Sequence, residues 1–139
     1  MSIEGEKIVL EDFLDQVQQE LKSGKFVLIP RAKNLQALAK HGLKSNDVFR
    51  TLCKLTSNDY AKGPLPDDSG DPCPVWIFRK TIDGKIFYIK IKLDPHVGVK
   101  CISFHEVETS YLLMLIYDKI WSWISNGFCR FEKWPTCSD

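Results

Sequence analysis

A tyrosine at position 88, a lysine at 90 and a histidine at 105 are the residues of this sequence best suited to catalysis. RNA cleavage without a metal needs a base that takes the 2′-hydroxyl proton, cations that hold the charge developing at phosphorus, and an acid that protonates the leaving 5′-oxygen. Histidine titrates near neutral pH, lysine is a fixed positive charge, and tyrosine can donate a hydrogen bond or stack on a base. These residue types therefore meet the needs of an RNA-cleaving site.

The same residues also have an ordinary structural interpretation. Tyr88, Lys90 and Lys92 can form the solvated face of a sheet, because antiparallel sheets often expose one face to water. His105 can be a strand-end histidine that is hydrogen-bonded to a neighbour. Residue type alone leaves both interpretations open.

A predicted antiparallel meander must position these side chains. Residues 75–80 and 86–93 are rich in aromatic and β-branched residues, and Asp83-Gly84 between them is a strong hairpin signal. A third strand is predicted over residues 99–105. Side chains alternate across a strand, which predicts a core face and a polar face. The predicted core positions are Phe87, Ile89, Ile91, Leu93, Ile102 and Phe104, and the predicted polar positions are Tyr88, Lys90, Lys92, Cys101, Ser103 and His105.

The first half of the chain is predicted to be helical. Apolar residues recur at helical spacing over residues 10–21, and Ser23-Gly24 ends that helix. Asn34 is a candidate N-cap for a second helix that Gly42 ends, and Ser45 for a third. Residues 26–29 are an edge strand or an extended linker, and residues 63–74 a surface loop. Helices followed by a meander predict an α+β fold, with helices packed on an antiparallel sheet.

The composition predicts one soluble globular domain. With 44% hydrophobic and 27% charged residues, the chain is not disordered, collagen-like or a coiled coil. The five cysteines are odd in number and form no C-x-x-C pair, so reduced thiols in a cytoplasm are expected rather than disulfides or zinc ligands. The N-terminus lacks the features of a secretory signal, so a cytoplasmic protein is expected. No metal or cofactor is predicted.

Four segments occur in an order and spacing that together resemble the MqsR-like toxins, the motility quorum-sensing regulator family. The segments are NDYAKGP at residues 58–64, VWIF at 75–78, FYIKIK at 87–92 and CISFHE at 101–106. The resemblance implies a RelE-like toxin fold and a toxin of a type II toxin-antitoxin system. It also implies a metal-independent endoribonuclease that cleaves single-stranded mRNA and is silenced by a cognate antitoxin protein.

The resemblance also implies site residues. The family's catalytic positions fall on Lys62, Tyr88 and His105. The substrate-binding residues expected around them are Lys90, Lys92, Arg79 and Trp76. Trp76 could stack a base, although a tryptophan is more often a core residue.

Two positions depart from the founding member of that family. His105 stands where the founding toxin has a lysine, so it could shuttle a proton near neutral pH where lysine would mainly supply charge. Ile77 stands where the founding toxin has a glutamine, which puts one substrate contact in doubt.

The resemblance ends near Glu106, which predicts a toxin domain over residues 1–106 and a C-terminal extension over residues 107–139. A helix is predicted over residues 111–124, and Asn126-Gly127 would end it. It falls short of the roughly 20 residues that span a bilayer. It could be a buried helix, an oligomer contact or, through Trp121 and Trp123, an interfacial membrane helix, and an altered reading frame would also explain its composition.

Two other functions remain open. A non-catalytic protein-binding module of the same fold would use the sheet edge or the apolar extension. DNA binding is supported only by Gly42 between two short helices, and the third helix offers just Arg50 and Lys54 as contacts. The preferred RNA sequence, the dependence on the ribosome and the oligomeric state do not follow from the sequence.

Overall fold

A computed structural model of the chain describes residues 3–107, with side chains from residue 9 onward. All helices and strands given below belong to a compact unit, Met1–Glu106. The helix predicted over residues 111–124 lies outside the described residues.

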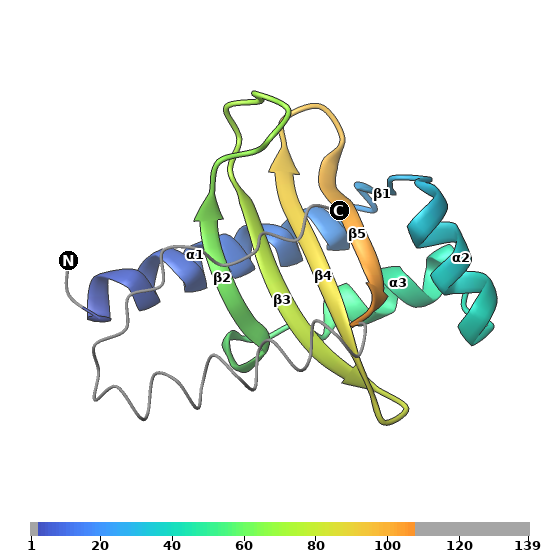
Figure 1. The fold of residues 1–139 in the computed structure, drawn as a ribbon. Coiled ribbons are helices and arrows are strands. Elements are labelled where there is room, and N and C mark those ends of the chain that lie inside the picture. Colours follow the sequence, from blue (N-terminus) through green and yellow to red (C-terminus); the bar gives the residue numbers. More distant parts are fainter. Residues whose placement is uncertain (1–2, 108–139) are drawn as a thin grey trace. The chain divides into compact units, whose positions relative to one another are not determined.

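Three helices precede most of a five-stranded sheet, which confirms the predicted α+β class. The sheet order is β1-β5-β4-β3-β2, with β1 parallel to β5 and the other neighbours antiparallel. Figure 1 shows α1 and α3 behind the sheet, so both helices cover one face. The elements are α1 (Ile3–Lys22), β1 (Phe26–Leu28), α2 (Ala32–His41), α3 (Ser45–Cys53), the 3₁₀ turn η1 (Ser57–Asp59), β2 (Tyr60–Leu65), β3 (Val75–Ile82), β4 (Lys85–Asp94) and β5 (Gly98–Glu106).

The core lies between the sheet and the helices. Phe13, Val17 and Leu21 of α1 are buried against the apolar face of β3, β4 and β5. The hairpin between β3 and β4 is confirmed: Asp83 and Gly84 have φ values of 52° and 77°, as a type I′ turn requires. A capping box closes the helical half, with Thr56 as the N-cap of η1.

Three expectations about local structure were wrong. β2 occupies Tyr60–Leu65, where a loop was predicted from residue 63 onward. It is an edge strand, and an edge tolerates a proline such as Pro64 that lacks an N–H donor. Asn34 is not an N-cap, because α2 begins at Ala32 and Arg31 occupies the N-cap position. Ser45 is not an N-cap either, because it is the first residue of α3 and Lys44 occupies the N-cap position.

A β-bulge interrupts β5 at Ile102. Ser103 pairs with Lys90 and Cys101 pairs with Ile91, so Ile102 is the extra residue. Side-chain alternation therefore shifts by one residue. Cys101 belongs to the buried core, against the expectation that it shared the polar face, and Ile102 is not in that core.

The side chain of Asn34 binds the bulge from α2. Its Nδ2 donates to the carbonyl of Ile102 at 2.9 Å and to that of Ile29 at 2.8 Å, and its Oδ1 accepts from the Phe104 N–H at 3.0 Å. Asn34 is 0% exposed. It therefore supplies a hydrogen bond to the backbone of Ile29, of Ile102 at the bulge and of Phe104 beyond it.

Replacing this asparagine should destabilise the fold. We expect Asn34→Ala to lower the free energy of unfolding by about 2–4 kcal/mol, because the buried Phe104 N–H and two part-buried carbonyl groups each lose a hydrogen bond. The matched control is Asn46→Ala at an exposed helical position, which should change stability by less than about 1 kcal/mol. Urea denaturation measures both variants, and equal stability of the two would contradict the role of Asn34.

Candidate active site

Tyr88 and His105 lie directly opposite each other on β4 and β5. Directly paired residues share a face of the sheet, so the side chains meet, and their rings stack with centroids 5.2 Å apart at an interplanar angle of 30°. Arg79 of β3 pairs with Tyr88 from the other side. The His105 Nδ1 lies 3.3 Å from the carbonyl oxygen of Glu106. We call Arg79, Tyr88 and His105 the aromatic row.

A second cross-strand row lies beside the first. Lys62 pairs with Ile77, Ile77 with Lys90, and Lys90 with Ser103, so four strands contribute one residue each. We call these four residues the lysine row. The rows are adjacent because Tyr88 and Lys90 are two residues apart on β4, as are Ser103 and His105 on β5. The structure thus brings the three sequence-predicted catalytic residues onto one face.

The orientations of Lys62 on β2 and of His105 on β5 both depend on β-bulges. On β5 the bulge at Ile102 moves Ser103 and His105 to the face of Tyr88 while Cys101 stays in the core. On β2 the register shifts between Tyr60, which pairs with the core residue Phe78, and Lys62, which pairs with Ile77. Strict alternation would place Tyr60 and Lys62 on the same face, and the shift places them on opposite faces.

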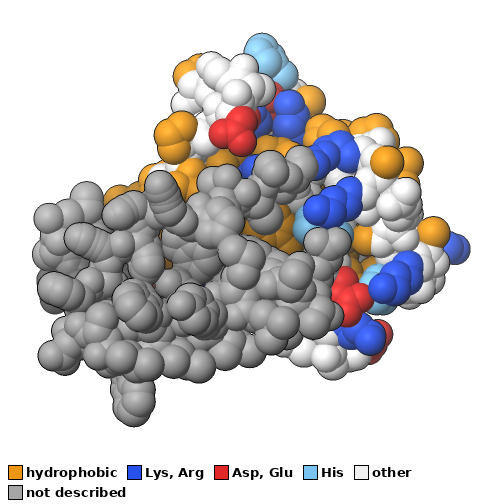
Figure 2. All heavy atoms as spheres, viewed as in Figure 1, with side chains coloured by type: hydrophobic (Ala, Val, Ile, Leu, Met, Phe, Trp, Pro, Cys, Tyr) orange, Lys and Arg blue, Asp and Glu red, His pale blue; other side chains and the backbone are white. Residues whose placement is uncertain are grey.

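The face lies away from the helices. Figure 2 looks onto it in the view of Figure 1, and blue Lys and Arg side chains with pale-blue His side chains gather among the described residues on the right, toward α2. Tyr88 is 2% exposed, Lys92 is 3% exposed and His105 is 8% exposed, whereas Lys62 is exposed. A solvated sheet face is therefore the wrong interpretation for Tyr88 and Lys92.

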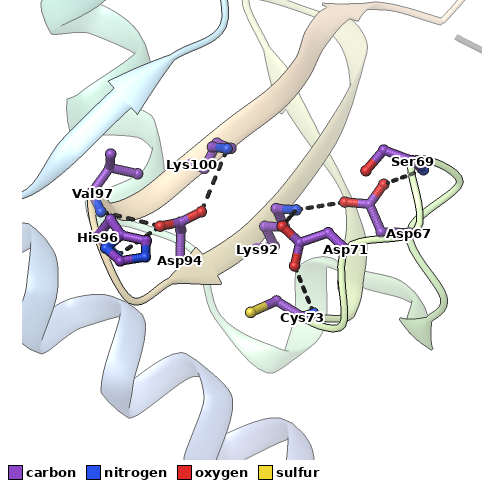
Figure 3. A network of polar contacts seen from close by, with 9 residues as sticks. All are labelled: Asp67, Ser69, Asp71, Cys73, Lys92, Asp94, His96, Val97 and Lys100. Atoms are coloured by element: carbon purple, nitrogen blue, oxygen red, sulfur yellow. Dashed lines mark hydrogen bonds and ion pairs between the residues drawn. The ribbon is translucent and has the colours of Figure 1, made fainter.

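Lys92 is held by carboxylates. Its Nζ lies 2.5 Å from Asp67 and 3.2 Å from Asp71, both in the loop between β2 and β3 (Figure 3). Lys92 also pairs directly with Lys100 across the sheet, and Lys100 has its own carboxylate in Asp94 at 3.5 Å. Like charges directly opposite repel, so these acids make the pairing of two lysines tolerable.

The ion pairs shift pKa values in the expected directions. The hydrogen bond from Lys92 lowers the pKa of Asp67 to about 2 from its ordinary value of 3.8, and the Ser69 N–H contributes. The Cys73 N–H, followed by Lys92, lowers the pKa of Asp71. Burial works to lower the pKa of Lys92, but the two carboxylates outweigh it and the pKa is raised. Lys92 therefore anchors the loop between β2 and β3, and the carboxylates of that loop neutralise its charge.

Trp76 lies in the core. It is 4% exposed and stacks on Phe13 with ring centroids 4.4 Å apart. Its partner on β4 is the core residue Ile91, so it faces the helices. The structure thus places it away from the predicted site, in the core position that large aromatic residues favour.

The described residues offer no metal centre and no membrane-crossing helix. Within residues 3–107 there is no cluster of three or more His, Cys, Asp or Glu side chains that could hold a metal ion. Among those same residues, no helix is both long enough and apolar enough to span a bilayer. Cys53, Cys73 and Cys101 are free thiols, and burial raises the pKa of Cys101.

The Asp67–Lys92 pair predicts a pH dependence of stability. Because the folded-state pKa of Asp67 is below its unfolded value, its contribution is present above about pH 4 and is lost as the pH falls toward 2. We expect the wild type to lose about 2 kcal/mol more than Asp67→Asn over that range. Asp68→Asn, at the exposed neighbouring position, should behave like the wild type. Denaturation at stepwise pH tests this, and parallel curves for wild type and Asp67→Asn would refute it.

Comparison with known proteins identifies the family of the chain. A family model described as motility quorum-sensing regulator, toxin of MqsA, matches residues 12–106. No curated protein matches the chain. The family match covers more than half of the chain and contains both rows of the candidate site. The chain therefore belongs to the motility quorum-sensing regulator toxin family, which makes it a toxin of a toxin-antitoxin system with a cognate antitoxin as its partner.

Proposed function

We propose that this toxin is a metal-independent endoribonuclease that cleaves single-stranded mRNA, with Tyr88 and His105 as its acid and base. The observation that supports this most directly is the cross-strand pair itself, in which the two rings stack 5.2 Å apart beside the lysine row. Proton donors and acceptors must lie within hydrogen-bond reach of one substrate, and neighbouring positions on paired strands satisfy that requirement.

In the proposed reaction the RNA supplies its own nucleophile. One of the two residues takes the proton of the 2′-hydroxyl, the 2′-oxygen bonds to phosphorus, and the P–O5′ bond breaks. The other residue gives a proton to the departing 5′-oxygen. The products carry a 2′,3′-cyclic phosphate and a 5′-hydroxyl, and no oxidant, reductant or water enters this step.

The lysine row supplies positive charge to the same step. Lys62 and Lys90 hold the scissile phosphate and stabilise the charge that develops on its oxygens. Ile77 lies between them in the register and contributes no polar group, so substrate contacts at this point differ from those of a family member with glutamine there. Arg79, opposite Tyr88, adds a third cation.

Two residues first grouped with the substrate contacts take structural roles in this proposal. Lys92 fixes the loop between β2 and β3 through Asp67 and Asp71, and Trp76 fills the core against Phe13. We further propose that residues 1–106 are the toxin domain and residues 107–139 an extension. We place the activity in the cytoplasm, under a type II antitoxin.

A non-catalytic binding module is the second candidate function. The observation in its favour is burial: with Tyr88 2% exposed and His105 8% exposed, little of either side chain is open to an RNA. Such a module would bind a partner protein without cleaving RNA.

An RNA cleavage assay in the presence of EDTA tests the proposed metal-independent endoribonuclease activity. We expect the purified full chain to cut a single-stranded RNA, His105→Ala to be slower by at least about a hundredfold, and Tyr88→Phe, which keeps the ring stack but removes the hydroxyl, to be slowed similarly. His96→Ala is the matched control, because His96 is exposed in the turn between β4 and β5. End-group analysis should find cyclic phosphate and 5′-hydroxyl termini.

The opposite results would separate the two candidates. The proposed reaction is contradicted if the wild type does not cleave RNA. It is also contradicted if His105→Ala cleaves as fast as the wild type. Controlled expression in bacteria then distinguishes the alternative. Equal growth of cells expressing wild type and His105→Ala, together with no cleavage, supports the binding module.

A further inference from the structure

The carboxylate of Glu106 joins the end of β5 to the end of α2. Its Oε1 lies 3.2 Å from the Nε2 of His41 and 3.6 Å from the Nζ of Lys40. His41 is the last residue of α2, and Glu106 is the last residue of β5. The His41 ring also packs against Phe87 with ring centroids 5.1 Å apart, and Phe87 is the partner of Glu106 on β4. Three elements therefore meet at the side chain of Glu106.

The backbone of the same residue contacts the imidazole of His105. The carbonyl oxygen of Glu106 lies 3.3 Å from the Nδ1 of His105. A carbonyl oxygen only accepts hydrogen bonds, so Nδ1 is the nitrogen that carries the proton in this contact. Glu106 thus contacts α2 through its side chain and His105 through its carbonyl.

The stacking of His105 on Tyr88 does not by itself determine where the ring nitrogens lie. Stacking fixes the plane of the imidazole, with ring centroids 5.2 Å apart and an interplanar angle of 30°. A half turn of the ring about its bond to Cβ exchanges Nδ1 with Cδ2 and leaves that plane unchanged. The Glu106 carbonyl distinguishes the two orientations, because it accepts a hydrogen bond from the nitrogen.

The position of this carbonyl needs support because β5 ends there. The pairing of β4 with β5 ends at Phe87 and Glu106, and the end of a strand opens more readily than its middle. The Lys40 contact adds little to overall stability, because its side chain is 73% exposed. The His41 side chain is only 16% exposed, so its contact is the one that restrains the Glu106 carboxylate. That restraint acts on the residue whose carbonyl contacts His105.

We propose that Glu106 is a positioning residue for His105. Its carboxylate, held by His41 at the end of α2, fixes the end of β5, and its carbonyl then keeps the imidazole in one orientation with the proton on Nδ1. This rests on the proposed function, in which His105 exchanges a proton with the RNA. Glu106 acts through His105 and does not itself contact the RNA.

The NMR signals of the imidazole rings test this role without any RNA. The chain has three histidines, so the His105 signals of the ¹⁵N-labelled full chain are identified by their loss in His105→Gln. At about pH 8, where an ordinary histidine is neutral, we expect the wild-type ring to be protonated at Nδ1. Glu106→Ala should move the signals toward a mixture of the two tautomers. Lys100→Ala is the matched control: it removes from β5 an ion pair of 3.5 Å with Asp94, and it should leave the His105 signals unchanged.

The kinetics of RNA cleavage give a second readout. Glu106→Ala should lower kcat about tenfold and change KM by less than about twofold, because a displaced imidazole slows proton transfer but leaves RNA binding intact. Glu106→Gln keeps the shape and a polar contact with His41, so it should recover most of the loss. His41→Ala removes the same contact from α2 and should reproduce both effects; it carries the tests if Glu106→Ala does not fold. Lys100→Ala should have the kcat of the wild type.

The outcomes separate the positioning role from the reaction. If the His105 signals are as unchanged in Glu106→Ala as in Lys100→Ala, the positioning role is overturned, whatever the cleavage assay gives. An equal fall of kcat in those two variants also overturns it, because a general loss of stability then explains both. A wild type that cleaves no RNA but shows the expected signal changes supports the positioning role and overturns the proposed reaction alone.

Discussion

The candidate site depends on one buried side chain, Asn34. A bulge costs a strand part of its hydrogen-bonding ladder, and in a buried strand the backbone groups beside it must find other partners. Asn34 reaches from α2 to the Ile102 carbonyl and the Phe104 N–H and supplies those partners. Because the bulge decides which side of the sheet Ser103 and His105 face, a helix residue that has no part in the proposed chemistry supports the composition of the site.

The arrangement of charge on the face follows from the strand register. The lysine row and the Lys92–Lys100 pair lie on the same side of the sheet, yet they differ in their surroundings. Lys92 and Lys100 each have carboxylates within ion-pair distance, so the acidic loop between β2 and β3 neutralises that end. Lys62 and Lys90 lie on the same face, beside the Tyr88–His105 pair.

A histidine at position 105 changes what this face can do. In the aromatic row it stacks on Tyr88, so two groups that can exchange protons are adjacent, whereas a lysine at the same place would add mainly charge. The apolar Ile77 in the middle of the lysine row has the opposite effect, because it removes a hydrogen-bonding group from the centre of the face. In the proposed reaction, proton transfer is thus concentrated on β4 and β5.

The sequence alone determined the elements whose signals are local. Alternation in residues 86–93 placed Tyr88 opposite the core, Asp83-Gly84 specified the hairpin, and four short segments identified the toxin family. Tertiary structure decided the rest. Four features depend on partners that are distant in sequence. They are the bulges that orient Lys62 and His105, the strand β2, the hydrogen bond of Asn34 to Ile102, and the ion pair of Lys92 with Asp67. A sequence pattern shows that side chains alternate along a strand. It does not show where the pairing with a neighbouring strand interrupts that alternation.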